Sequence, residues 1–323
     1  MAPAGEFGRI ATYFAPLAAG YPGAFGLRDD AAVLAPSDGA ELVVTTDTIV
    51  AGVHYLGDEP PGLIAAKLLR VSLSDLAAMG AAPRAYTLNI ALPSAVDDTW
   101  VAAFAAGLAA DQDRYGIVLI GGDSVTTPGP TTLTVTGFGE VPVGGALRRD
   151  GAKPGDVIFV SGTIGDAALG LLAARGRLAV PGAAALMDRY RLPLPRLDLG
   201  QNLRGLVHAA TDISDGLVAD LGHIAAVSRV AARIDVEAVP LSVAARAALA
   251  TDARLIETIL TGGDDYELVF TVPRSSAKRL AALADEIDLP LTAIGDIQEG
   301  AGVMVFDAAG AALPLSRAGY AHG

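Results

Sequence analysis

Strand-like and helix-like stretches alternate along the whole chain, and this alternation limits the folds that the chain can adopt. Runs of β-branched residues bounded by Gly, Pro or Asp predict strands, and apolar residues at helical spacing predict helices. Because both kinds are mixed throughout, the fold class is expected to be α/β or α+β. Strands are predicted at 41–50, 85–92, 116–123, 131–141, 156–162, 232–239, 266–272, 291–297 and 302–310. Helices are predicted at 62–79, 98–114, 165–175, 182–190, 198–208, 217–229, 242–250 and 275–286.

The length of the chain and one Gly- and Pro-rich stretch predict two domains. A chain of 323 residues exceeds the usual size of one domain. The stretch "VPVGGALRRDGAKPGD" at 141–156 separates two groups of predicted elements, as linkers of this composition do. We therefore expect an N-terminal domain at 1–145 and a C-terminal domain at 146–323.

The charge of the chain restricts its partners. With 36 acidic against 23 basic residues the net charge is −13, so the surface repels nucleic acid and anionic membranes. Neither is expected as a partner. A phosphorylated small molecule remains compatible, provided that metal ions, local Arg side chains or backbone N–H groups offset the repulsion.

The absence of Cys excludes further classes of site. With no Cys there is no disulfide framework, no thiolate zinc site and no Cys nucleophile, which fits a cytoplasmic location. The first residues lack the basic flank and apolar core of a signal peptide. The longest apolar helical stretch stops at Asp111 and is too short to span a bilayer.

Asp residues recur at the ends of apolar runs, beside Gly, Ser or Thr. Taken singly, each fits a turn or a helix cap, and Asp29 and Asp220 are expected to be such capping or solvated residues. As a set they differ, because most have no Lys or Arg next to them, and two bare carboxylates about 4 Å apart repel by roughly 4 kcal/mol. Converging carboxylates with Thr hydroxyls nearby suit Mg²⁺. The set is Asp29, Asp30, Asp47, Asp75, Asp123, Asp212, Asp215, Asp264 and Asp265.

Several familiar catalytic motifs are absent. "IGGDS" and "TGGDD" allow a ligand to approach the backbone closely, but the chain has no G-x-x-x-x-G-K-[ST] loop and no HRD or DFG set. It also has no G-x-S-x-G elbow and no pair of His residues at zinc spacing. His54 follows Asp47 across a Gly-containing loop, and is either a substrate contact or an ordinary loop residue. His208 and His223 are expected on helix faces.

An ordered set of motifs resembles the thiamine-monophosphate kinase family, which shares an ATP-binding superfamily with aminoimidazole ribonucleotide synthetase and selenophosphate synthetase. The motifs are "LRDDAAVL", "TTDTIVAGVHYL", "SDLAAMGA", "LIGGDS", "RRDGAKPGD", "DISDGLVADLGHI", "GGDDYEL" and "GYAH", and they span nearly the whole chain. The resemblance implies transfer of the γ-phosphoryl group of ATP to thiamine monophosphate, with several Mg²⁺ ions. It also implies a homodimer, in which N-terminal ATP- and Mg²⁺-binding domains pair into a barrel-like core beside C-terminal α/β domains.

The resemblance also assigns residue roles. Asp47 and Asp75 are expected to hold the ions between donor and acceptor, as the catalytic pair. Metal contacts are implied for Asp30, Thr45, Thr46, Asp47, Asp75, Asp123, Asp212 and Asp215. ATP contacts are implied for Gly122, Asp123, Arg149 and Ser214, and substrate contacts for His54, Asp264 and Tyr320.

The chain departs from the family pattern at a few positions. Thr45 is often Ser, Ser72 is often Asn, and Asp264 is more often Glu. Asp is one methylene shorter than Glu, which puts a direct substrate contact at 264 in question. Two alternatives remain: another ATP-using member of the superfamily, of the cyclo-ligase type, and a non-catalytic nucleotide- or metal-binding protein. Relatives that need a Cys do not fit a chain without one.

Overall fold

The structure is a computed structural model that describes residues 5–320. The chain divides into two compact units. The first unit holds the chain up to Leu76 and residues 81–144, and the second holds residues 77–80 and everything from Gly145 onward. The expected boundary after residue 145 lies one residue beyond this division, and the end of the "GYAH" motif, Ala321 and His322, lies outside the described residues.

The first unit is built on an open four-stranded sheet in the order β1-β4-β2-β3. Strands β1 and β4 pair antiparallel, as do β2 and β4, whereas β2 and β3 run parallel. The strands are β1 (Ala40–Val50), β2 (Ala82–Pro93), β3 (Val118–Thr127) and β4 (Thr132–Pro142).

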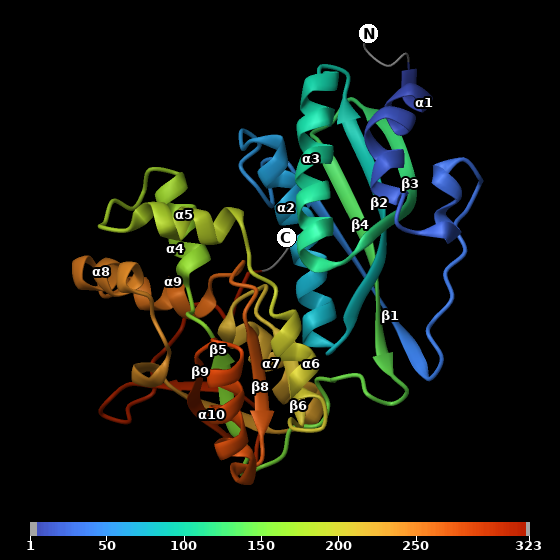
Figure 1. The fold of residues 1–323 in the computed structure, drawn as a ribbon. Helices are drawn as coiled ribbons and strands as arrows, with labels where there is room; N and C mark the ends of the chain where they lie inside the picture. The colour runs from blue at the N-terminus through green and yellow to red at the C-terminus, as the bar shows by residue number, and fades with distance from the viewer. Residues whose placement is uncertain (1–4, 321–323) are drawn as a thin grey trace. The chain divides into compact units, whose positions relative to one another are not determined.

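Two long helices, α2 (Pro61–Ala78) and α3 (Asp98–Tyr115), run along this sheet (Figure 1). They bury apolar side chains such as Leu73 and Phe104, and a buried ion pair joins Arg70 of α2 to Asp111 of α3 at 2.7 Å. The chain before the sheet forms α1 (Gly5–Arg9) and then short π- and 3-10-helical turns up to Leu27.

The second unit contains a six-stranded sheet in the order β10-β7-β9-β5-β8-β6. Only the β10–β7 pair is parallel among the pairs of this sheet; the others are antiparallel. The strands are β5 (Val157–Ser161), β6 (Ala209–Asp212), β7 (Ala231–Asp235), β8 (Leu268–Val272), β9 (Leu291–Gln298) and β10 (Gly302–Phe306).

Helices surround this second sheet and complete its core. Leu221 and Ile224 of α7 pack with Ile158, Val160 and Val269 of the sheet in one buried cluster. The helices are α4 (Asp166–Ala174), α5 (Ala183–Arg191), α6 (Leu197–Leu203), α7 (Leu217–Ser228), α8 (Val243–Thr251), α9 (Leu255–Thr261) and α10 (Ala277–Glu286).

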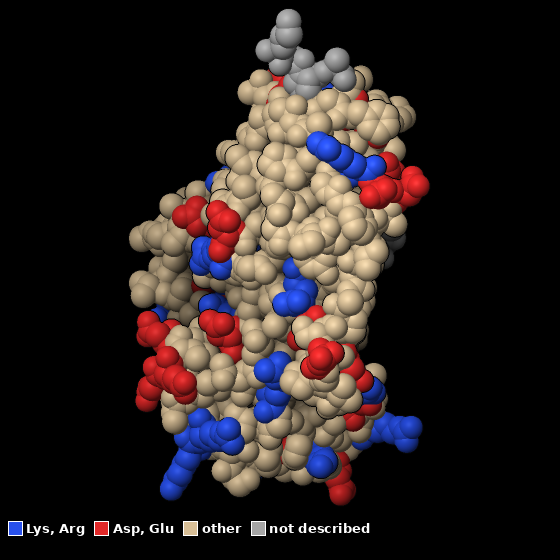
Figure 2. Space-filling model, turned by 45° about the vertical axis from the view of Figure 1, so that its right-hand side comes forward, with Lys and Arg blue, Asp and Glu red and all other residues tan. Residues whose placement is uncertain are grey.

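Acidic and basic side chains are interspersed on the face of the molecule drawn in Figure 2. Small groups of both signs alternate with broad areas that carry neither. Among the described residues, no helix combines the length and the apolar character that crossing a membrane requires.

The mixed α/β class predicted from the sequence is confirmed, but short elements such as α1, β6 and α9 were missed. Helix α1 has only five residues and strand β6 only four, too few to show a period, and α9 carries two Thr residues and a Glu in a seven-residue stretch. The expectation that His208 lies on a helix is wrong, because α6 ends at Leu203 and His208 hydrogen-bonds Thr271 just before β6. The barrel-like dimer core stays a prediction, since the described sheet of the first unit is open.

Candidate functional site

Two carboxylates accept hydrogen bonds from two hydroxyls where β1 faces α2. Thr45 and Asp47 are two residues apart on β1, so they share one face of the strand. Ser72 and Asp75 are three residues apart on α2, so they share one face of the helix. The Ser72 hydroxyl donates to Asp47 Oδ2 at 2.8 Å, and the Thr45 hydroxyl donates to Asp75 Oδ2. The structure thus brings together three residues predicted for the metal site and adds Ser72.

A glycine in β4, Gly137, lies next to this contact between strand and helix, and a Cβ there would make ordinary van der Waals contacts. Gly137 pairs with Thr45 across the ladder, and a Cβ at Gly137 would lie 3.4 Å from Thr45 Cγ2 and 3.7 Å from Ser72 Cβ. Burial under the helix raises the pKa of Asp47, and the Ser72 hydrogen bond offsets part of this effect. The carboxylate of Asp47 is therefore held where a positive charge is needed to stabilise its ionised form.

Thr46 lies on the opposite face of β1. Its hydroxyl contacts that of Thr136 at 3.2 Å and donates to Val135 O at the same distance. The side chain is thus separated from those of Thr45 and Asp47 by the two-residue period of the strand. Asp47 lies inside β1 and Asp75 inside α2, as the predicted strand at 41–50 and helix at 62–79 imply.

A pocket of about 630 Å³ in the first unit groups Asp30 with Gly122 and Asp123. Its walls are mostly apolar, with Leu34 and Phe138 among them, and its polar groups include both carboxylates. Gly122 has φ 153°, and a Cβ there would lie 1.8 Å from the carbonyl oxygen of Leu88. Only glycine fits at this point of the parallel β2–β3 pair, which brings a bare backbone to the pocket.

The loop after β1 presents His54 in one tautomer. The Val50 N–H donates to Nδ1 of His54 at 3.1 Å, so a neutral ring carries its proton on Nε2. Glu59, buried to 7% exposure, accepts from the N–H groups of Leu56 and Gly57 at 3.0 and 2.8 Å. Glu59 therefore fixes the backbone of the loop at Leu56 and Gly57, a role that the sequence did not reveal.

In the second unit, the loop between β6 and α7 is shaped by Asp220. Asp220 Oδ2 accepts from the N–H groups of Ser214, Asp215 and Gly216 at 3.0, 3.0 and 3.1 Å. Burial raises the pKa of Asp220 to about 7, against the opposing effect of the Asp215 N–H bond. Asp220 caps the loop as expected, but it is 2% exposed, so the solvated alternative is wrong.

Backbone hydrogen bonds join this loop to two distant segments of the same unit. The Asp264 N–H donates to Ser214 O at 2.8 Å, and the Tyr320 N–H donates to Asp215 O at 2.9 Å. Four residues with predicted roles, from three segments, therefore lie side by side. Asp212, at the end of β6, is 2% exposed and precedes the loop directly.

Arg149 lies in the stretch that leads into the second unit. It is exposed, and its Nε donates to Thr211 Oγ1 at 3.0 Å, one residue before Asp212. The Ser228 hydroxyl donates to the carbonyl oxygen of Arg149 at 2.9 Å, which fixes the backbone there. A cationic side chain is thus held at the start of the loop between β6 and α7, residues 213–216, which we call the Asp-rich loop.

Both units offer donor atoms that fit Mg²⁺. In the first unit these are carboxylate and hydroxyl oxygens, the ligands that hard cations prefer. In the second unit, ligand atoms of Asp215, Asp220 and His223 lie within 4.8 Å of one another. His223 is exposed on α7, and its distance of three residues from Asp220 was the only sign in the sequence of this grouping.

Family models match most of the chain. Residues 28–141 match the N-terminal domain of AIR synthase related proteins, and residues 153–307 match the C-terminal domain. Apart from residues 77–80, the first match falls in the first unit, and the second match falls in the second unit.

Relatives of known name extend the match to the full length. The thiamine-monophosphate kinase of Caulobacter vibrioides is 44% identical, covering 100% of this chain and 92% of the relative. That of Salmonella typhimurium is 42% identical, covering 98% of each.

Solved structures agree with these relatives. A crystal structure of the thiamine-monophosphate kinase of Stenotrophomonas maltophilia is 47% identical with a TM-score of 0.81, covering 86% of this chain and 89% of that chain. A complex of AaThiL with AMPPCP and TMP is 32% identical with a TM-score of 0.76, covering 89% of each chain. With full-length similarity in sequence and fold, this chain belongs to the thiamine-monophosphate kinase family.

Proposed function

We propose that this protein transfers the γ-phosphoryl group of ATP to thiamine monophosphate, giving thiamine diphosphate and ADP. The observation that carries the proposal is the 44% identity with a thiamine-monophosphate kinase over the full chain. The AaThiL complex, which holds AMPPCP and TMP, supports the same pair of substrates. The reaction is expected in the cytoplasm.

The donor set supports a role for several Mg²⁺ ions. Asp47, Asp75 and Thr45 would hold ions in the first unit, as would Asp30 and Asp123, and Thr46 would contact an ion from the opposite face of β1. Asp212 and Asp215 would do so in the second. Bound Mg²⁺ neutralises phosphate charge, which reduces the repulsion between two anionic substrates. Buried Asp47, with its raised pKa, is a carboxylate that such a cation stabilises.

The other predicted residues bind and orient. We assign Gly122, Asp123, Arg149 and Ser214 to ATP, because two lie at a bare backbone in a pocket and two at the Asp-rich loop. We assign His54, Asp264 and Tyr320 to thiamine monophosphate. His54 offers an Nε2–H donor from a loop that Glu59 fixes.

Transfer is proposed to be direct. A phosphate oxygen of thiamine monophosphate attacks the γ-phosphorus, the bond to the β,γ-bridging oxygen breaks, and ADP leaves with that oxygen. A phosphate monoester is largely ionised near neutral pH, so little general-base help is needed. Incubation with γ-labelled ATP and no acceptor should leave the denatured protein unlabelled. Stoichiometric label that is chased into thiamine diphosphate would show a phosphoenzyme instead.

The test of the function is incubation with ATP, Mg²⁺ and thiamine monophosphate, with the product identified by mass. Thiamine diphosphate should form, its formation should stop with excess chelator, and Mg²⁺ should restore it. ATP binding without turnover, measured by calorimetry, would favour the non-catalytic alternative. Full activity in excess chelator would overturn the metal assignment.

We also propose that the protein is a homodimer that pairs through the first unit. Leu42, Val44 and Val125 are 37, 57 and 50% exposed on its sheet, and apolar strand surface of this kind is typical of interfaces. Val44→Lys should shift the sedimentation of the protein toward a monomer. A monomeric wild-type protein at micromolar concentration would contradict the proposal.

A further inference from the structure

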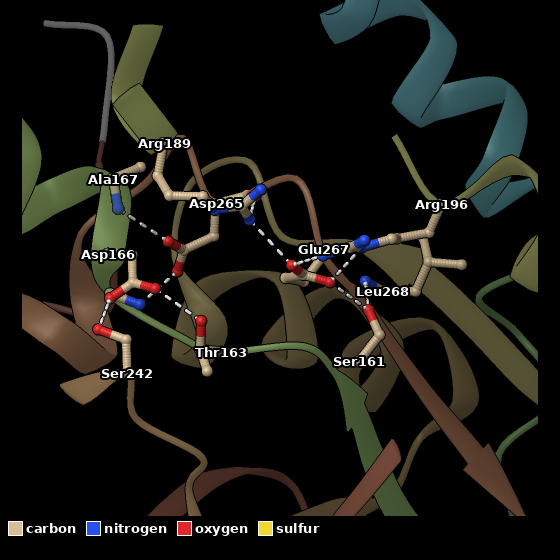
Figure 3. A network of polar contacts seen from close by, with 11 residues as sticks. Ser161, Thr163, Asp166, Ala167, Arg189, Arg196, Ser242, Asp265, Glu267 and Leu268 are labelled. Atoms are coloured by element: carbon tan, nitrogen blue, oxygen red, sulfur yellow. Dashed lines mark hydrogen bonds and ion pairs between the residues drawn. The ribbon is translucent and has the colours of Figure 1, made fainter. Parts of the chain in front are cut away.

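The segment 262–267 contains two buried acidic residues, Asp265 and Glu267, whose hydrogen bonds and ion pairs fix its backbone. Asp265 and Glu267 point into the second unit, where they are anchored (Figure 3). Asp265 accepts from the N–H groups of Gly165 and Ala167 at 2.6 and 3.2 Å, at the start of α4. Burial raises the pKa of Asp265 to about 8. Asp264 and Tyr266 belong to the same segment.

Glu267 is the stronger anchor. It is fully buried, accepts from the Ser161 hydroxyl at 2.6 Å, and forms ion pairs with Arg189 at 2.9 Å and with Arg196 (Figure 3). Arg196 Nε donates to its second carboxylate oxygen at 2.7 Å, so the contact is bidentate. Arg189 also donates to the carbonyl oxygen of Asp265 at 3.1 Å, so one arginine fixes both anchors.

The anchors hold a backbone that would not adopt its shape alone. Asp264 has φ 72° and Tyr266 has φ 51°, both in the left-handed region. Such conformations cost free energy and persist only where neighbouring contacts impose them. Here the Asp264 and Tyr266 N–H groups both donate at 2.8 Å, to Ser214 O and Ile213 O respectively. The segment is therefore pre-organised next to the Asp-rich loop.

The Tyr266 hydroxyl donates to Asp264 Oδ1 at 3.2 Å. The ring of Tyr266 is 7% exposed, so its direction is fixed by packing, whereas Asp264 is only partly buried. We propose that Tyr266 is a positioning residue for the acceptor substrate, acting through Asp264. The bond fixes the rotation of a short carboxylate, so that it meets a donor or cationic group of thiamine monophosphate in one orientation. This inference rests on the proposed function.

The test is Tyr266→Phe, which removes the hydroxyl and keeps the ring. A hydrogen bond to a charged group contributes about tenfold in affinity. We expect the KM for thiamine monophosphate to rise about tenfold, while kcat and the KM for ATP change less than twofold. A purely structural role would instead lower the melting temperature and affect both substrates. Tyr86→Phe is a matched control, because it removes a buried hydroxyl that donates to Gln112 at the same 3.2 Å in the first unit. It should leave the KM for thiamine monophosphate unchanged.

A double-mutant cycle separates action through Asp264 from direct contact. Asp264→Asn keeps a residue that tolerates the left-handed backbone. In that background Tyr266→Phe should change the KM less than twofold, because the charge it orients is gone. Additive effects would overturn the inference in favour of a direct Tyr266 contact, and an unchanged KM in Tyr266→Phe would overturn it outright. A wild-type protein that forms no thiamine diphosphate would instead overturn the proposed function.

Discussion

The carboxylates where β1 faces α2 and the carboxylate of Glu267 are held in two different ways. Where β1 faces α2, Asp47 accepts a hydrogen bond from the neutral hydroxyl of Ser72, and Asp75 accepts one from that of Thr45. In the second unit, Glu267 is paired with two arginines.

The difference distinguishes carboxylates that are proposed to bind a ligand from carboxylates that stabilise the fold. A neutral donor orients a carboxylate and leaves its charge to be matched by a cation from solution. An arginine matches the charge permanently. A buried carboxylate with only hydroxyl donors is destabilising until a cation binds. A buried carboxylate paired with arginine becomes destabilising when the arginine is removed.

The largest effect is expected from Asp47→Asn or Asp75→Asn. Loss of a metal-binding carboxylate should lower kcat about a thousandfold, since metal assistance contributes several kcal/mol to the barrier. The melting temperature should stay the same or rise for Asp47→Asn, because burial disfavours the ionised form in the folded protein. Steady-state kinetics and thermal unfolding check both parts. A kcat within tenfold of wild type would contradict the proposal that Asp47 and Asp75 bind a metal ion whereas Glu267 stabilises the fold.

Arg196→Ala should have the largest effect on stability. It leaves Glu267 buried with one arginine, and breaking a buried pair costs about 3–5 kcal/mol. For a unit of this size the melting temperature should fall by about 10 °C. Arg254→Ala is the matched control, because it breaks an Arg–Asp pair whose arginine side chain is 90% exposed. Equal melting temperatures for the two variants would show that burial does not matter here.

A smaller effect is expected in the pH dependence of stability. The Asp265 pKa is raised from 3.8 to about 8 by burial, so between these values the folded state holds a proton that the unfolded state has lost. The free energy of unfolding should therefore fall as the pH rises from 6 to 8, by about 1.4 kcal/mol per pH unit at most for this one group. Asp220, with a pKa of about 7, adds to the slope below that value.

Asp265→Asn should flatten this slope, measured by denaturant titration at several pH values. Asp150→Asn is the control. The hydrogen bond from Arg148 lowers the pKa of exposed Asp150, so this carboxyl group does not titrate between pH 6 and 8. An unaltered slope in Asp265→Asn would mean that Asp265 is ionised in the fold and is stabilised by the helix start.

The smallest effect is expected from Glu59→Gln. Glu59 is a carboxylate of the first unit that serves the fold, since it accepts two backbone N–H groups of the His54 loop. Gln retains only one acceptor oxygen, so the loop should loosen and the KM for thiamine monophosphate should rise about threefold, with kcat retained. A drop in kcat like that of Asp75→Asn would place Glu59 with the ligand-serving carboxylates.

The fold class and most elements were predictable because the patterns are long. Strands such as β1 and β4 have eleven residues each, enough to show their period. Strand β6 and helix α9 were not, because their short stretches carry no clear period and form through pairing with distant segments.

The predicted site shows the same limit. The Asp residues were identifiable by their type and by the lack of basic neighbours in sequence. That Ser72 donates to Asp47 depends on how a helix and a strand 25 residues apart are packed, whereas the opposite face of Thr46 follows from the period of the predicted strand. The Arg partners of Glu267, at separations of 71 and 78 residues, had no local signal at all.

The end of α2 gives the division of the chain an unusual form. Residues 77–80, a few positions after the Asp75 turn, belong to the second unit, where Arg204 donates to Gly80 O at 2.9 Å and Leu147 N–H donates to Met79 O at 3.0 Å. A single cut after residue 144 in the gene would therefore give two fragments, of which the second lacks a buried piece of its own packing. Recombination between relatives at that point would pack residues 77–80 from one parent against the second unit of the other.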